Sequence, residues 1–123
     1  MITEEIPEDE KRIMKIFNAS DYDKIPNSAD ESMKIYFDFL NKNLVFPIAG
    51  THTQETGPFK SETISVNLNS ISELYDDFYG ILVEGRNGRK KVAIPLVDFD
   101  PDEHATDENL QIIDDYKTWF SNW

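Results

Sequence analysis

The spacing of the hydrophobic residues changes twice along the chain, and this change limits the possible folds more than any other feature. Up to Leu44 the apolar residues recur at helical intervals, whereas residues 45–97 form short runs rich in β-branched and aromatic residues, separated by Gly, Pro and Asn. Helical spacing returns after residue 106. A chain of 123 residues buries one core, so the helices and strands must share it. The sequence therefore predicts an α+β fold.

Three segments have the pattern of amphipathic helices. Residues 7–17 begin with Pro and acidic residues, which suit the start of a helix. Residues 29–43 follow a capping-box signature, Ser28 with Glu31 three residues later. Thr106 is a suitable N-cap for a C-terminal helix. The stripe of that helix that we expect in the core consists of Ile112, Ile113, Tyr116, Trp119, Phe120 and Trp123.

Between the helices the sequence predicts short antiparallel strands. Asn87-Gly88 separates two of the runs and predicts a hairpin with a type I′ turn, in which both residues have positive φ. Pro95 limits the length of the last strand, because proline cannot donate a hydrogen bond to a sheet. About five such strands suit a small SH3-like antiparallel β-barrel flanked by N- and C-terminal helices. The predicted strand regions are residues 45–54, 59–68, 78–86 and 89–97.

The charge of the chain excludes several classes of partner. With 24 acidic and 12 basic residues the net charge is −12, so nucleic acid and anionic membrane are disfavoured as ligands. A cation or a basic protein remains as a partner. Cysteine is absent and the N-terminus is acidic rather than basic and apolar, which favours a cytoplasmic protein.

The acidic residues are densest in residues 98–115, which carry eight carboxylates and no Lys or Arg. Calcium prefers six to eight oxygen ligands, so a cation could relieve the repulsion among these groups. An EF-hand loop beginning at Asp98 would need Gly at its sixth position and Glu at its twelfth, where this chain has Glu103 and Asn109. A loop beginning at Asp21 fails in the same way. Spacing alone therefore leaves two alternatives, a solvated acidic loop or a cation site assembled from separate segments.

Other candidate sites also have plain structural alternatives. Asp76 and Asp77 could simply form a β-turn, where Asp is favoured. Asp114 and Asp115 are adjacent on a helix and diverge by about 100°, so they cannot chelate one ion as a pair without ligands from elsewhere in the chain. Two isolated histidines do not make a zinc site, no GxSxG motif is present, and a chain this short does not suit a glycosidase cleft. We therefore expect no enzyme activity.

Three longer runs resemble a known family. "YFDFLNKNLVFPIAG", "YGILVEGRNGRKKVAIPLVDFD" and "NLQIIDDYKTWFSN" occur in that order, and over about residues 33–122 the chain resembles the small acidic calcium-binding proteins of the CcbP family. The resemblance implies Ca²⁺ binding without EF-hands, through surface carboxylate clusters on a small barrel. It divides the chain into an N-terminal helical extension and linker, residues 1–28, and a CcbP-like calcium-binding domain, residues 29–123.

The resemblance also implies which acids bind the metal. In this interpretation Asp98 and Asp100, with Asp38 and either Asp114 or Asp115, form the main site. A second, looser site consists of Asp76, Asp77 and Glu84. The protein would act as a cytoplasmic calcium buffer or low-affinity sensor. The alternative is an acidic protein-interaction module that docks a basic partner.

Overall fold

The computed structural model describes residues 6–76 and 78–123, and it confirms an α+β fold. Three helices form where the sequence predicts them, close to the expected bounds. The helices are α1 (Glu8–Ile16), α2 (Asp30–Asn43) and α3 (Asp107–Asn122), with 3₁₀ turns η1 (Tyr22–Lys24) and η2 (Leu96–Asp98). The strands are β1 (Ile48–Gly57), β2 (Lys60–Asp76), β3 (Gly80–Asn87), β4 (Lys90–Pro95) and β5 (Phe99–Pro101).

The five strands form one antiparallel sheet in the order β4-β3-β2-β1-β5. Within the described residues β4 and β5 pair with one neighbour each, so the sheet is open and the expected SH3-like barrel is not confirmed. The sheet is nevertheless strongly curved. β4 ends at Pro95 on one edge of the sheet, β5 begins at Phe99 on the other edge, and only η2 connects them. Four residue steps span about 15 Å at most, so the curvature must bring the two edges close together. The last strand has three residues and ends in Pro101, which leaves little backbone for closing a barrel.

The β3–β4 hairpin forms at the predicted place, but its turn lies one residue later than expected. Asn87 pairs with Lys90, so the two loop residues are Gly88 and Arg89. Gly88 has a φ of 60°, whereas Asn87 and Arg89 are not among the residues with positive φ. Positive φ at the first loop residue alone is typical of a type II′ turn, so the predicted type I′ turn is wrong. The Asn87 side chain instead donates to the Ser65 carbonyl at 2.7 Å.

The helix starts were predicted with mixed success. Thr106 caps α3 as expected, because its Oγ1 accepts from the Asn109 N–H at 3.1 Å. The capping box of Ser28 and Glu31 is wrong, since the N-cap of α2 is Ala29. The Ala29 N–H donates to Ser32 Oγ at 2.9 Å. The side chain that accepts a backbone hydrogen bond at the start of α2 is therefore Ser32, which lies inside the first turn of the helix.

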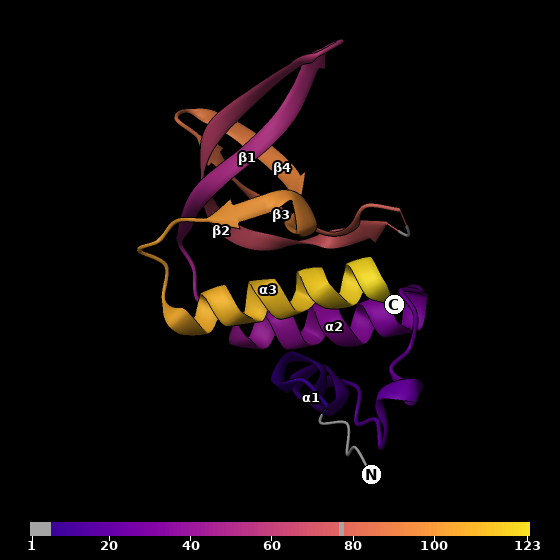
Figure 1. Cartoon of the computed structure of the whole chain (residues 1–123). Helices are drawn as coiled ribbons and strands as arrows, with labels where there is room; N and C mark the ends of the chain where they lie inside the picture. Colours follow the sequence, from indigo (N-terminus) through magenta and orange to yellow (C-terminus); the bar gives the residue numbers. More distant parts are fainter. Residues whose placement is uncertain (1–5, 77) are drawn as a thin grey trace.

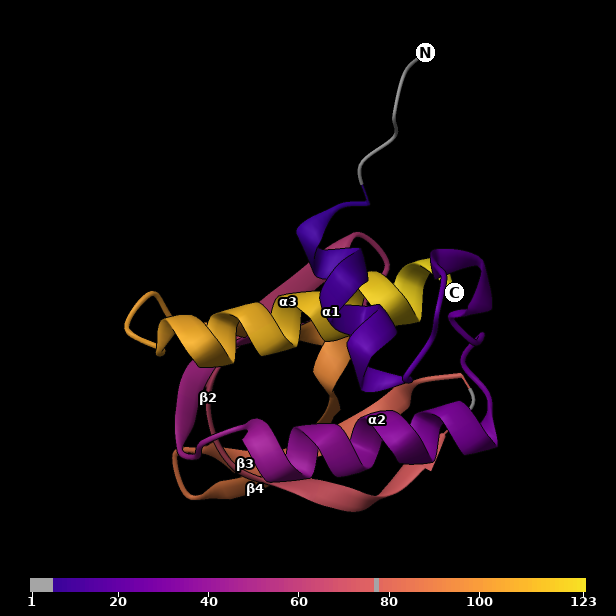
Figure 2. The same cartoon turned by 90° about the horizontal axis from the view of Figure 1, so that it is seen from below.

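The molecule has three layers (Figure 1). α2 and α3 lie side by side against the sheet, and α1 crosses over their other side (Figures 1 and 2). Tyr116 and Trp119, two members of the predicted stripe on α3, are fully buried in the core. Tyr36 of α2 is fully buried beside them. Ile13 of α1 is fully buried in the same core. The N-terminal helix is therefore packed into the one core of the protein.

The far end of the β1–β2 hairpin projects away from the helices (Figure 1). Its strand residues from Thr53 to Glu62 are exposed, and Phe59 at its turn is fully exposed. Within the described part of the chain, no helix is both long enough and apolar enough to cross a membrane.

Candidate metal site

A surface pocket of about 530 Å³ lies between β5 and α3. Asp100 reaches it from the edge strand, and Gln111, Asp114 and Lys117 reach it from α3. Residues three apart on a helix share a face, so α3 presents these three polar side chains in one row. The pocket therefore brings together two of the predicted ligands, Asp100 and Asp114, which are distant in sequence. Its remaining lining residues are Pro101, Leu110 and Ile113.

The pocket also contains a basic side chain. Lys117 Nζ lies 3.2 Å from Asp100 Oδ1 and donates a hydrogen bond to it. The side chain of Lys117 is 24% exposed and that of Asp100 is 70% exposed, so the ion pair lies at the rim of the pocket and faces water. Asp114 is exposed beside it on α3.

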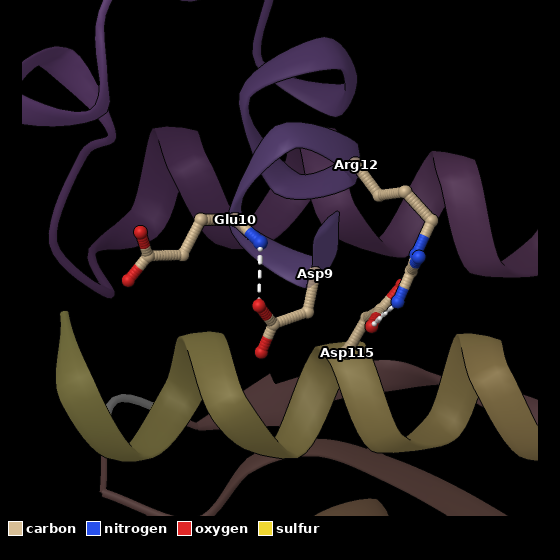
Figure 3. A network of polar contacts seen from close by, with 4 residues as sticks. All are labelled: Asp9, Glu10, Arg12 and Asp115. Atoms are coloured by element: carbon tan, nitrogen blue, oxygen red, sulfur yellow. Dashed lines mark hydrogen bonds and ion pairs between the residues drawn. The ribbon is translucent and has the colours of Figure 1, made fainter. Parts of the chain in front are cut away.

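Asp115 has a different environment from Asp114, as their divergence on the helix predicts. Arg12 Nε donates to Asp115 Oδ2 at 2.6 Å and Arg12 Nη2 donates to Oδ1 at 2.9 Å (Figure 3). The Asp115 side chain is only 6% exposed. The hydrogen bond that Arg12 donates to Asp115 raises the pKa of Arg12, so the guanidinium stays charged. This carboxylate is therefore neutralised by α1 and does not face the pocket.

The remaining members of the predicted main site are further apart. Asp98 is exposed at the end of η2, where its carbonyl lies 3.2 Å from His52 Nδ1. Asp38 is exposed on α2 and is not among the residues that line the pocket. In the parts of the chain that the structure describes, no three carboxylate or histidine side chains gather closely enough to hold one metal ion. The structure therefore brings together Asp100 and Asp114, and not the full predicted set.

The predicted second site is also spread out. Asp76 Oδ1 accepts from the N–H groups of Phe78 at 2.6 Å and Tyr79 at 2.9 Å. Asp76 therefore stabilises a turn, the structural alternative given for it from the sequence. Asp76 pairs with Gly80 of β3, and Glu84 lies four residues further along the same strand. Asp76 and Glu84 are therefore about 13 Å apart along the sheet, too far to share one ion. Glu84 lines a separate pocket of about 410 Å³ that includes Arg86 and Lys91. Asp77 lies outside the described residues.

The donor chemistry of the β5–α3 pocket suits a hard cation. Two carboxylates and the Gln111 amide supply oxygen atoms, and calcium accepts carboxylate, amide and water oxygens at flexible geometry. Sequence reasoning missed Gln111 and Lys117. Their spacing from Asp114, three residues on either side, was the available signal, but which strand they face is set by the tertiary fold.

Comparisons with known proteins agree with this architecture. A family model for calcium-binding proteins of the CcbP type matches residues 11–120. The crystal structure of Anabaena CcbP superposes with a TM-score of 0.70 at 18% identity, covering 98% of this chain and 96% of that one. A calcium-binding protein in its calcium-binding form superposes with a TM-score of 0.67 at 18% identity, covering 93% and 92%. No curated protein sequence is a significant match.

Proposed function

The chain belongs to the CcbP family of calcium-binding proteins, and from this premise we propose that it binds Ca²⁺ in the β5–α3 pocket, with Asp100 and Asp114 as carboxylate ligands. The protein acts as a calcium buffer or low-affinity sensor and not as an enzyme. The observation that carries the proposal is the placement of two carboxylates from separate elements in one pocket. A cation between them would relieve part of the repulsion in residues 98–115.

The proposed ligand set is smaller than the sequence suggested. Gln111 contributes an amide oxygen, and Asp98 is a candidate for contact through water. Asp38, Glu84 and Asp115 are not part of this set, because none of the three is among the residues that line the pocket. The second cluster, with Asp76 and Asp77, stays a prediction from the resemblance.

The site implies a modest affinity. Calcium takes six to eight oxygen ligands, and with two carboxylates most of them must be neutral protein oxygens or water. Affinity in calcium proteins falls with fewer charged ligands and less rigid sites, so we expect a Kd of about 10⁻⁶ to 10⁻³ M. This range suits buffering or sensing of large calcium changes.

Calorimetric titration of the demetallated protein with calcium tests the assignment. Asp100→Asn and Asp114→Asn should each weaken binding at least about tenfold, since each removes one of two charged ligands. Asp38→Asn is the matched control, because it removes the same charge from an exposed position outside the pocket. Equal weakening by all three variants, or none by the first two, would contradict the assignment.

A second candidate function is docking of a basic protein partner. The carboxylates of residues 102–108 are largely exposed. In the described residues no three acidic side chains converge on one position, and such a dispersed arrangement is typical of an acidic docking surface. Such a surface predicts salt-sensitive association with basic proteins and equal responses to calcium and magnesium. A calcium-selective response would favour the first function.

A further inference from the structure

Lys117 is the one basic side chain among the residues that line the β5–α3 pocket. Its amine lies 3.2 Å from Asp100 Oδ1, and it is one helical turn from Asp114. The side chain is 24% exposed, which means that most of it is packed against the protein. The pocket therefore holds a cation of its own beside both proposed calcium ligands.

A structural role does not account well for this ion pair. Asp100 is 70% exposed, and ion pairs in contact with water contribute little to stability. The amine also acts on any second cation that enters the pocket. An ammonium and a divalent ion repel each other over several ångströms even in water, and a metal bound by Asp100 would meet Lys117 at its side.

We propose that Lys117 is a tethered cation that competes with Ca²⁺ for Asp100 and so sets the calcium affinity of the pocket. This inference rests on the proposed function. Without calcium the amine neutralises Asp100. When calcium enters, the amine leaves Asp100 for solvent, which the partial exposure of the lysine allows. The affinity is therefore lower than the carboxylates alone would give, and it is tuned by one residue that is not a ligand.

The test uses calorimetric titration of the demetallated 123-residue protein with CaCl₂ at fixed ionic strength. Lys117→Met removes the charge without adding an oxygen ligand, so any gain in affinity cannot come from a new ligand. We expect the Kd to fall by about three- to tenfold, the effect that Coulomb's law gives for a divalent ion about 6 Å from an ammonium in water, reduced by salt. Lys117→Arg keeps the charge and should bind calcium as the parent does, or more weakly.

Lys11→Met is the matched control. Lys11 Nζ lies 3.4 Å from Glu8 Oε1 in another exposed ion pair, on α1 and not among the residues lining the pocket. The variant makes the net charge more negative by the same amount, so it measures the effect of overall charge. Its Kd should stay within twofold of the parent. Thermal unfolding without calcium checks that each variant folds.

The outcomes separate this inference from the proposed function. Calcium binding with equal affinity in the parent and Lys117→Met overturns the inference and leaves the proposed function standing. An equal gain in Lys117→Met and Lys11→Met assigns the effect to net charge and also overturns it. Binding only after Lys117→Met supports the competition. Absence of binding in every protein overturns the proposed function and the inference with it.

Discussion

Tyr36 and Tyr116 pack together in the core, with ring centroids 5.3 Å apart, but their hydroxyl groups are satisfied differently. The Ile81 N–H donates to the Tyr116 hydroxyl at 2.9 Å. The Tyr36 hydroxyl is fully buried and is the one buried side-chain polar atom in the described residues without a hydrogen-bond partner. A buried polar group without a partner costs free energy, so the two hydroxyls contribute to stability with opposite sign.

This contrast predicts opposite effects of the same substitution. Tyr36→Phe should leave the free energy of unfolding unchanged or raise it by about 1 kcal/mol, because it removes an unsatisfied group. Tyr116→Phe should lower it by about 1–2 kcal/mol, because it leaves the buried Ile81 N–H without an acceptor. Urea unfolding at neutral pH measures both. A larger loss for Tyr36→Phe than for Tyr116→Phe would contradict the assignment.

The same residues predict how stability changes at alkaline pH. Burial raises the pKa of Tyr36 and of Tyr116 well above the usual value of 10. In the unfolded chain both phenols ionise near pH 10, whereas in the folded protein they stay protonated. The free energy of unfolding is therefore independent of these two ionisations below pH 10 and falls as the pH rises above it, at up to about 1.4 kcal/mol per pH unit for each tyrosine.

Absorbance at 295 nm measures tyrosine ionisation directly. Two of the five tyrosines should ionise only as the protein unfolds, at the pH where the far-ultraviolet circular dichroism is lost. Tyr36→Phe should reduce the number that ionises with unfolding by one. Ionisation of all tyrosines before any loss of secondary structure would show that neither phenol is held in the core.

At the scale of the elements, α1 is part of the folded unit and not a loose extension. Arg12 joins it to Asp115 of α3, and Ile13 is fully buried in the shared core. The linker that follows α1 is also held, because Trp119 Nε1 donates to the Pro26 carbonyl at 3.0 Å. The hydrophobic core therefore includes residues on both sides of the proposed boundary after residue 28, and this boundary marks a change in the sequence and not a division of the core.

The adjacent carboxylates of α3 predict a separation of stability from calcium binding. Asp115→Asn should lower the free energy of unfolding by about 2 kcal/mol, since it weakens a bidentate ion pair whose carboxylate is 6% exposed. It should change calcium affinity little. Asp114→Asn should do the reverse, because Asp114 is exposed and lines the pocket. Chemical unfolding and calorimetric titration of both variants measure the two effects.

The helices were predictable from the sequence, and the site only in part. Helical periodicity and a cap such as Thr106 are local signals, so α1, α2 and α3 were found within a residue or two. The divergence of Asp114 and Asp115 follows from helix geometry alone and is confirmed. The open sheet, the three-residue β5 and the contact of Lys117 with Asp100 depend on pairings between distant segments. No local pattern encodes them.

At the scale of the whole molecule, a net charge of −12 opposes compaction through self-repulsion. In the described residues most acidic side chains are exposed, and Asp115 is the only buried acid. Any cation therefore relieves some repulsion, but only a coordinating site distinguishes one divalent ion from another. Magnesium is smaller, requires octahedral geometry and loses its water reluctantly, so a flexible pocket of few carboxylates should favour calcium.

The most direct test of this account is the thermal unfolding of the demetallated protein, titrated separately with calcium and magnesium at fixed ionic strength. A ligand that binds only the folded state stabilises it by RT ln(1 + [L]/Kd). We predict a calcium-selective rise in Tm that begins near the Kd, at micromolar to low-millimolar concentration, and then grows with the logarithm of the calcium concentration; at ten times the Kd it is about 1.4 kcal/mol or roughly 5 °C. Equal shifts with calcium and magnesium would contradict a calcium site and would indicate that the carboxylates only carry charge.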